Sequence, residues 1–515
     1  MKKQLEKLKK FWKLIFGRTG ILVFLLLVQA VILFGGFALI DKSAWIVNYT
    51  IGLLAVIILI YILNARSNSS FKLMWIILIL VVPVVGVAFY IFTRVQPGTA
   101  YISHRVNALI EEEKDYLTPH KDTLYDVYAE SKQECGFMQY LYKRGKYPVY
   151  SNASVKYFPL GEDKFQELLY QLERAEKFIF LEYFIVDKGI MWNRILRILA
   201  RKAREGVEVR FMYDGTCTLS LLPRNYPKRL EQLGIQCKIF APMRPFLSTH
   251  QNNRDHRKIA VIDGRAAFTG GVNLADEYIN AEQRFGYWKD AALRVEGDAA
   301  WNFTVMFLNF WNAFRSSETD YDAFRPMPLV PPVSDGIVQP YADSPLDEEP
   351  MAETVYLNIL AQAQRYVYIY TPYLAVGEEM LDALKNAAKR GVDIRLVLPG
   401  IPDKKLVFRL SRSYYLPLLR AGVRIYEYTP GFLHAKCWVS DDVTAVVGSI
   451  NMDYRSLFLH FECGVLLQKN SQVAVLRDDV RATLPQCREI QVTECRTSLP
   501  GTVLDSVLRL LSPLM

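Results

Sequence analysis

The sequence contains little cysteine and little histidine. Its seven cysteines are odd in number, scattered along the chain, and form no Cys-x-x-Cys pair, so we expect neither a disulfide framework nor a metal site. Six histidines occur among the 515 residues: His104, His120, His250, His256, His434 and His460. Because histidine is this rare, the position of each one is informative about chemistry.

Positive charge is in excess but unevenly distributed. The net charge is +9, and seven of the 62 Lys and Arg residues lie in the basic amino-terminal flank, residues 1–19. The excess is therefore partly a local feature rather than a surface for nucleic acid. We expect no nucleic-acid partner and no cofactor.

Three uncharged apolar runs follow the flank, at residues 20–40, 44–63 and 73–92. Each has about the 20 residues that a helix needs to cross a bilayer, so region 20–93 is predicted to form transmembrane helices. Basic residues in the flank and between the second and third runs predict a cytoplasmic start. With three spans, the rest of the chain would lie at the outer face of the cell membrane; one run lying flat in the interface would reverse this.

The remainder is organised as a duplication. Residues 94–150 are polar and charged and are predicted to connect the membrane region to the rest of the chain. Residues 151–325 and 336–515 each alternate short β-branched and aromatic runs with helical stretches in the same order. This repetition predicts two similar α/β lobes with mixed, largely parallel sheets. The proline-rich segment 326–335 is the predicted linker.

Each lobe contains the same gapless pattern, H-x-K-x4-D-x6-G-[GS]-x-N. The first copy comprises His256, Lys258, Asp263, Gly270, Gly271 and Asn273, and the second comprises His434, Lys436, Asp441, Gly448, Ser449 and Asn451. Six specified positions at fixed spacing, found twice in corresponding places, are improbable by chance. The pattern therefore indicates a shared chemical site.

The spacing indicates how the side chains are arranged. Histidine and lysine two residues apart on a strand share one face, whereas the aspartate has the opposite phase and is expected to order the hairpin. Gly264 predicts a tight turn, and folding the chain about the peptide bond after it places Asn273 opposite His256. The same construction places Asn451 opposite His434.

Two such clusters suit displacement at a phosphodiester. One imidazole would attack phosphorus and form a covalent intermediate, while the other would serve as general acid and then general base, with no metal required. Fixed donors would stabilise the developing charge on the phosphate oxygens. The expected phosphate-binding residues are Lys258, Asn273, Lys436, Ser449 and Asn451.

A histidine in either role benefits from an acceptor that fixes its tautomer. Glu462 follows His434 by 28 residues, and Asp290 follows His256 by 34 residues. Each carboxylate is the candidate for the histidine of its own lobe, although either could be a solvated surface charge. Two further histidines of the lobes are expected to be structural or peripheral: His250 and His460.

The paired patterns resemble the HKD motifs of the phospholipase D superfamily, and residues 44–515 are similar to bacterial cardiolipin synthases. Further matching segments are Met74-Trp75, Thr371-Pro-Tyr373, Gly431-Phe-Leu-His434, Asn451 to Ser456 and Leu508 to Leu514. The resemblance implies that one phosphatidylglycerol in the bilayer donates its phosphatidyl group to a histidine and releases glycerol. A second phosphatidylglycerol accepts the group to give cardiolipin. The resemblance also implies that His256 is the nucleophile and that His434 is the general acid and base.

Other functions use the same residues. A hydrolytic phospholipase D would employ water as acceptor, and another phosphatidyltransferase would employ a different alcohol. A nuclease and a membrane scaffold with idle motifs are weaker alternatives, because apolar runs accompany the motifs and every motif position is filled. Acyl-chain preference and oligomeric state stay open.

Overall fold

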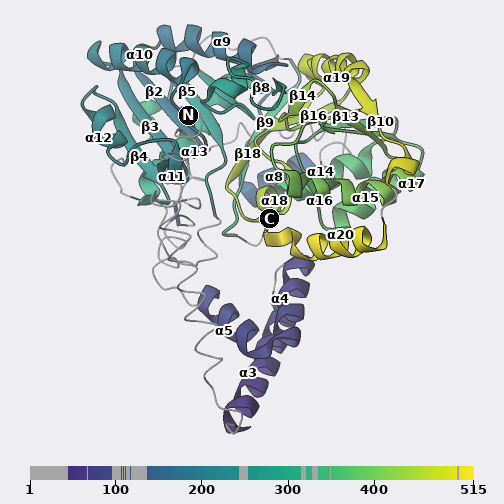
Figure 1. The fold of residues 1–515 in the computed structure, drawn as a ribbon. Coiled ribbons are helices and arrows are strands. Elements are labelled where there is room, and N and C mark those ends of the chain that lie inside the picture. The colour runs from purple at the N-terminus through teal and green to yellow at the C-terminus, as the bar shows by residue number, and fades with distance from the viewer. Residues whose placement is uncertain are drawn as a thin grey trace, which may run out of the picture.

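A computed structural model describes most of the chain. The described residues are 45–65, 68–94, 136–242, 253–314, 320–326, 335–347, 349–495 and 498–514, with isolated positions between 106 and 117. The predicted flank 1–19, the first apolar run 20–40 and most of the linker 326–335 lie outside them. Figure 1 shows two lobes side by side with three helices below them.

The second and third apolar runs form a bundle of three helices. These are α3 (Trp45–Asn64), α4 (Ser69–Val81) and α5 (Pro83–Arg94). A single helix over 73–92 was the wrong prediction, because Pro83 lacks a backbone N–H and begins a new helix instead of continuing the first. At Gly86, α5 approaches α4 so closely that an added Cβ would lie 2.7 Å from the Cα of Ile79. Within the described part of the chain, no helix reaches the length and apolarity that crossing a bilayer requires.

The first lobe is built on a sheet with strand order β1-β8-β6-β5-β2-β3-β4. Its strands are β1 (Ala153–Phe158), β2 (Phe178–Tyr183), β3 (Glu208–Asp214), β4 (Gln236–Phe240), β5 (Lys258–Ile262), β6 (Ala266–Gly270) and β8 (Ala292–Gly297). Its helices are α9 (Gly161–Glu173), α10 (Ile190–Arg204), α11 (Cys217–Ser220), α12 (Tyr226–Glu231) and α13 (Ala299–Phe314).

The second lobe repeats this plan with strand order β19-β13-β12-β10-β15-β16-β18-β9. The strands are β9 (Ile337–Asp343), β10 (Tyr366–Tyr370), β12 (Asp393–Pro399), β13 (Arg424–Tyr428), β15 (Cys437–Ser440), β16 (Thr444–Gly448), β18 (Glu462–Gln468) and β19 (Cys487–Glu489). The helices are α14 (Met351–Gln362), α15 (Glu378–Lys389), α16 (Lys405–Ser413), α17 (Tyr415–Arg420), α18 (Tyr454–Phe458), α19 (Ser471–Thr483) and α20 (Leu499–Leu511).

Both sheets are mixed, as expected, but they are not largely parallel. Strands β2, β3 and β4 run parallel, as do β10, β12 and β13, because helices connect these strands as crossovers. The motif hairpins β5–β6 and β15–β16, and the strands that flank them, pair antiparallel. Each motif therefore lies in the antiparallel half of its sheet.

The two lobes share backbone and side-chain contacts. Short strands β7 (Tyr287–Lys289) and β14 (Gly431–Leu433) pair parallel across the lobes, and α19 of the second lobe packs against β1 of the first. Helix α8 (Gly136–Gly145), from the predicted connecting segment, packs against α14 and β9. The end of that segment is therefore part of the second lobe's packing.

Candidate active site

The cross-strand register of both motif hairpins differs by one residue from the predicted register. In the first, Ile262 pairs with Ala266, which leaves a three-residue turn centred on Gly264. Continuing this register brings Val272, not Asn273, opposite His256. The second hairpin has the same geometry, with Ser440 paired to Thr444, so the predicted cross-strand partners were wrong in both lobes.

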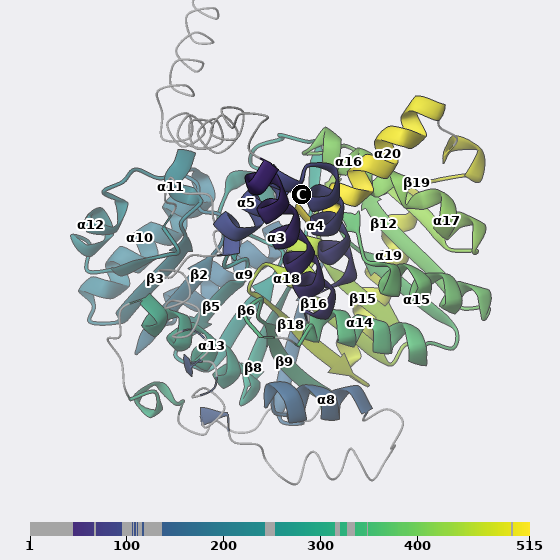
Figure 2. The same ribbon diagram turned by 90° about the horizontal axis from the view of Figure 1, so that it is seen from below.

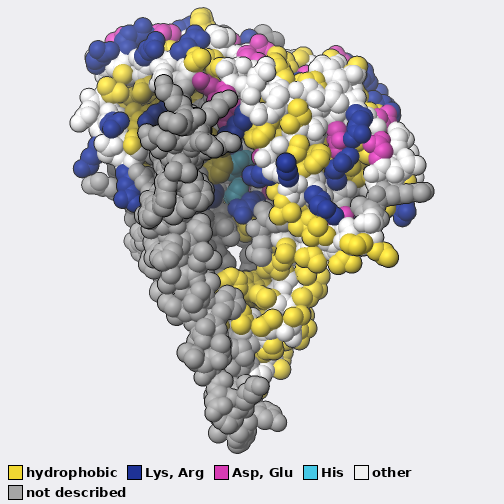
Figure 3. Space-filling view, viewed as in Figure 1, with side chains coloured by type: hydrophobic (Ala, Val, Ile, Leu, Met, Phe, Trp, Pro, Cys, Tyr) yellow, Lys and Arg dark blue, Asp and Glu magenta, His cyan; other side chains and the backbone are white. Residues whose placement is uncertain are grey.

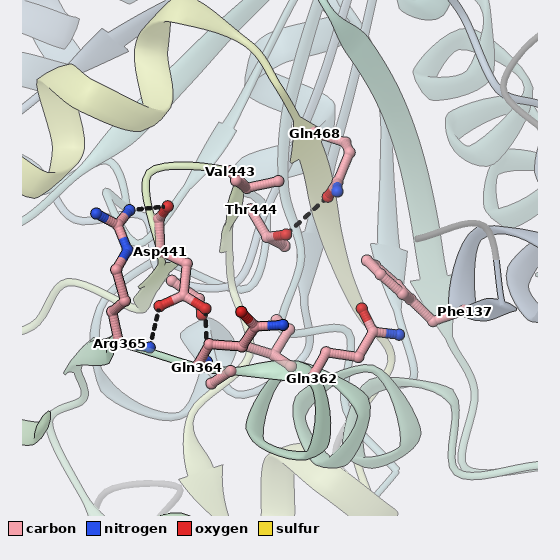
Figure 4. A pocket seen from close by; sticks show the side chains of 11 residues that line it. Phe137, Gln362, Gln364, Arg365, Asp441, Val443, Thr444 and Gln468 are labelled. Atoms are coloured by element: carbon pink, nitrogen blue, oxygen red, sulfur yellow. Dashed lines mark hydrogen bonds between the residues drawn. The ribbon is translucent and has the colours of Figure 1, made fainter. Parts of the chain in front are cut away.

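The motif aspartates explain the shift. Asp263 has φ 52° and Asp441 has φ 56°, so both leave the ladder and join the turn. The Asp263 carboxylate accepts hydrogen bonds of 2.8 to 3.3 Å from the backbone N–H groups of residues 176–178. Figure 4 shows Asp441 in the corresponding place, beside a cavity of about 370 Å³, where it accepts from the N–H groups of residues 364–366. Each aspartate thus fastens its hairpin to the neighbouring strand.

We expect Asp263→Asn to lower stability more than it lowers catalysis. Strand β5 separates the carboxylate from His256 by roughly 16 Å, and the lost charge-assisted hydrogen bonds should cost about 2 to 3 kcal/mol. Thermal unfolding followed by intrinsic fluorescence measures the effect. Asp382→Asn, which removes only an exposed i,i+3 ion pair, is the control and should leave the unfolding temperature nearly unchanged. Unaltered stability with a large loss of activity would instead place Asp263 in the chemistry.

Each motif histidine is bonded to a carboxylate of the other lobe. Nδ1 of His256 lies 2.8 Å from Oε1 of Glu462, and Nδ1 of His434 lies 2.7 Å from Oδ2 of Asp290. The sequence reasoning selected these two carboxylates but assigned each to the histidine of its own lobe, which was wrong. The structure exchanges them, so neither lobe alone contains a complete histidine–carboxylate pair.

Backbone bonds across the lobes produce this exchange. The N–H of His256 donates to the carbonyl of Phe461 at 3.0 Å, and the N–H of His434 donates to the carbonyl of Lys289 at 2.7 Å. The accepting residue in each case directly precedes the carboxylate. The same interface contact therefore positions the histidine backbone and its side-chain partner together.

The two carboxylates have different surroundings. The hydroxyl of Ser449 donates to Oε2 of Glu462 at 2.5 Å and accepts from the N–H of Cys463, so it faces a carboxylate where the sequence predicted a phosphate contact. In the first lobe, the equivalent position is Gly271. An added Cβ there would lie 2.0 Å from Oδ1 of Asp290, which explains why this position has no side chain.

The motif lysines are buried beside the histidines. Lys258 and Lys436 are each 2 % exposed, and each ammonium donates to the backbone carbonyl of its own motif histidine. Burial lowers the pKa of Lys258 to about 8 and that of Lys436 to about 7, against the opposing effect of the nearby carboxylates. Charge at this site is therefore costly until an anion enters.

The motif asparagines are buried but differ in their bonds. Oδ1 of Asn273 accepts from the N–H of Ile185 at 3.0 Å, and its amide donates to the hydroxyl of Tyr278 at 2.9 Å. Tyr278 in turn lies 5.4 Å from the His434 ring, centroid to centroid. Asn451 is different, because its Oδ1 has no hydrogen-bond partner among the described residues. Asn273 thus supports the wall beside His434.

The titration of the four paired groups is asymmetric. Burial, followed by the motif lysines, holds the pKa of His256 well below its usual range and lowers that of His434 to about 4. Burial raises the pKa of Glu462 to about 7. Burial alone would also raise the pKa of Asp290, but His434 and Lys436 outweigh it and lower that pKa. Asp290 is therefore the carboxylate that stays ionised near neutral pH.

His460, which the sequence predicts to be structural or peripheral, lies beside the site. Its ring centroid lies 5.3 Å from that of His256, and its Nδ1 lies 3.9 Å from Oε1 of Glu462. His460 precedes Glu462 by two residues, and this strand-like spacing was the available signal that both face one side. His250 lies outside the described residues.

His256, His460 and Glu462 have a spacing that could hold a metal ion. The hydrogen bond between His256 and Glu462 already accounts for the closest of these contacts. Lys258, and the arginines that lower the pKa of His460 after burial, oppose a divalent cation here. Within this cluster His256 and Glu462 share a hydrogen bond, whereas Nδ1 of His460 has no hydrogen-bond partner among the described residues.

Aromatic side chains form the walls of the site. The Phe184 ring lies 4.8 Å from the His256 ring, and the Trp288 and Phe432 rings lie 5.2 and 5.9 Å from the His434 ring, centroid to centroid. Apolar walls lower the local dielectric, so the fixed charges of the site act more strongly on a bound anion.

Known proteins share this architecture. A family model described as "Cardiolipin synthase, PLD-like domain" matches residues 168–286 and 356–483, and one described as "Phospholipase_D-nuclease N-terminal" matches residues 53–94. A phosphatidylserine synthase of Haemophilus influenzae shares the fold, with a TM-score of 0.56 and 12% identity over 75% of this chain and all of that one.

Relatives in sequence extend over nearly the whole chain. A cardiolipin synthase of Alkalihalophilus pseudofirmus is 33% identical over 97% of this chain and 100% of its own length. One from Halalkalibacterium halodurans is 34% identical over 92% of this chain and 94% of its own, and an uncharacterized protein of Streptococcus mutans is 45% identical over 88% and 99%. The chain therefore belongs to the cardiolipin synthase family of the phospholipase D superfamily and is a phosphatidyltransferase.

Proposed function

We propose that this enzyme is a cardiolipin synthase, which transfers a phosphatidyl group from one phosphatidylglycerol to another and releases glycerol. The observation that carries the proposal is the convergence of two histidine–lysine pairs on one buried site, each histidine held by the opposite lobe. Two imidazoles at one phosphodiester can divide nucleophilic and proton-transfer work.

In the first half-reaction, the imidazole of His256 attacks phosphorus and a P–N bond forms. The bond from phosphorus to the glycerol oxygen breaks, and the leaving alkoxide takes a proton from His434. Lys258 and Lys436 stabilise the negative charge that builds up on the phosphate oxygens. In the second half-reaction, His434 removes the proton from the hydroxyl of the second phosphatidylglycerol. That oxygen then attacks phosphorus and the P–N bond breaks.

The different pKa shifts of Asp290 and Glu462 favour His256 as the nucleophile and His434 as the general acid and base. A nucleophilic imidazole must be neutral, and the pKa of His256 is held well below its usual range by burial and by neighbouring cations. A general acid must be able to take up a proton. The ionised Asp290 opposes the lowering of the His434 pKa by burial and Lys436, and a bound phosphodiester anion would raise that pKa.

The substrate class places the enzyme at a lipid surface. Phosphatidylglycerol and cardiolipin reside in the bilayer, so we propose that the enzyme resides in the cell membrane and that the apolar amino-terminal runs help to attach it. The multi-pass arrangement and the outer face are predictions from run lengths and loop charges alone.

A product assay on vesicles tests the proposal. The purified full chain, reconstituted into phosphatidylglycerol vesicles, should form cardiolipin and free glycerol in equal amounts, as measured by mass spectrometry of the lipids and an enzymatic glycerol assay. A His256→Ala, His434→Ala double variant is the control and should form neither. Phosphatidic acid in place of cardiolipin would show a hydrolase, and activity that requires an added alcohol would show a different transferase.

A further inference from the structure

The carboxyl-terminal helix α20 carries an apolar face without a protein partner among the described residues. The exposed fractions are 84% for Leu499, 63% for Val503 and 45% for Val507. Leu504 and Leu511 are also exposed and lie on the same side at helical spacing. Exposed apolar side chains that lie next to one another on the surface of a folded protein mark an interaction site.

The opposite side of α20 is fastened to α16. Asp505 accepts a hydrogen bond of 2.7 Å from Arg409, and Arg509 donates to the hydroxyl and the carbonyl of Ser413. Ser498 caps the start of the helix by accepting from the N–H of Gly501. These bonds fix which side faces outward, so the exposure of the apolar stripe is built into the fold.

The stripe continues onto other apolar surface. Helix α20 also packs against α4, whose Leu73, Leu80 and Val81 are exposed. Figure 2, seen from below, shows α20 beside α4 at the underside of the lobes, and Figure 3 shows apolar side chains running from the helical bundle onto the second lobe. The histidine surface in the hollow between the lobes lies above this region in Figure 3.

Cationic and aromatic side chains connect this underside to the catalytic site. Lys404 and Lys405 are exposed at the start of α16, beside α20. The Lys404 ammonium lies 5.4 Å from the centroid of the Tyr373 ring, that ring lies 6.3 Å from the Phe432 ring, and Phe432 lies beside His434. The positive charge at the edge of the stripe complements an anionic headgroup.

We propose that α20 is an interfacial helix that lies in the surface of an anionic phospholipid bilayer and holds the opening of the catalytic site against it. Its apolar stripe enters the acyl-chain boundary, while Lys404 and Lys405 meet the headgroups. A substrate phosphate then reaches the two histidines without leaving the lipid surface. The choice of anionic lipid rests on the proposed function, but the apolar face and its fixed orientation do not.

A labelling experiment tests contact directly. The full chain is reconstituted into phosphatidylglycerol vesicles that contain a small fraction of phosphatidylglycerol with a diazirine in one acyl chain, illuminated, digested and analysed by mass spectrometry. We expect adducts on peptides covering residues 499–511. Absence of adducts there, with adducts on residues 45–94, would overturn the proposal.

Matched variants test the consequence for catalysis. Val503→Glu, Val507→Glu places two charges on the stripe, and we expect at least about a tenfold loss of cardiolipin formation on vesicles. With short-chain phosphatidylglycerol below its micelle concentration, the rate should stay within about twofold of the parent, because surface substitutions rarely disturb the fold. Val503→Leu, Val507→Leu changes the same two positions but keeps the stripe apolar, and should be active on both substrates.

Three outcomes contradict the inference. Equal losses on both substrates would show a structural role for α20, and unchanged activity on vesicles would show that the stripe is not used. Concentration-dependent dimers of the parent in detergent that the stripe variant abolishes would assign the face to a second copy of the chain. A parent enzyme that makes no cardiolipin but retains the labelling would overturn the proposed function and leave the lipid contact standing.

Discussion

A His434→Ala variant should release one equivalent of nitrophenol from phosphatidyl p-nitrophenol in a burst and then turn over only slowly. Nitrophenolate leaves without a proton, so the first half-reaction needs the nucleophile His256 but not the general acid. The second half-reaction still needs a base for the incoming hydroxyl, so the phosphohistidine should accumulate. Steady-state turnover should fall about 10²- to 10⁴-fold, the usual contribution of acid–base catalysis.

The matched variant is His256→Ala, which should show no burst at all. Rapid-mixing absorbance gives the burst amplitude, and mass spectrometry of the trapped enzyme locates the phosphatidyl group on the peptide that contains residue 256. A burst from His256→Ala with none from His434→Ala would reverse the two roles. Full turnover by both variants would exclude a phosphohistidine.

Short-range sequence patterns were sufficient to predict the two lobes, several strands and most residues of the site. The duplicated motif identified two lobes, and the short strand-like runs matched strands such as β2, β10 and β18. These features depend on alternation and turn residues, which act within a few positions of the chain. The motif residues and both partner carboxylates were selected for the same reason.

Features fixed by distant contacts were predicted less well. The hairpin register depends on whether Asp263 belongs to the strand or to the turn. That choice is set by backbone N–H groups more than 80 residues earlier in the chain, which spacing within the motif cannot reveal. A one-residue shift then reassigns every cross-strand neighbour.

The partner exchange between lobes has the same origin. Within one lobe, Glu462 follows its motif histidine at a plausible distance, and sequence order favours that pairing. The pairing of β7 with β14 and the contact between residues 255 and 461 bring the opposite carboxylate closer. Only the geometry of the interface decides between the two arrangements, so the site exists only where the lobes meet.

The exchange predicts a specific pattern in combined variants, measured on the His434→Ala background. There the burst depends on His256 alone, so Glu462→Gln should slow the burst about 10²-fold or more by removing the carboxylate that sets the His256 tautomer. Asp290→Asn should leave the burst within about twofold, because the histidine that Asp290 orients is already absent.

In the enzyme with both histidines, however, Asp290→Asn should lower cardiolipin synthesis about 10²-fold or more, comparable to loss of a histidine-orienting carboxylate in other catalytic sites. Together, the two results would show that Asp290→Asn impairs the enzyme only when His434 is present. Pairing within each lobe would give the reverse pattern, with Asp290→Asn slowing the His434→Ala burst and Glu462→Gln sparing it. The burst rates of the three proteins that lack His434 therefore separate the two arrangements.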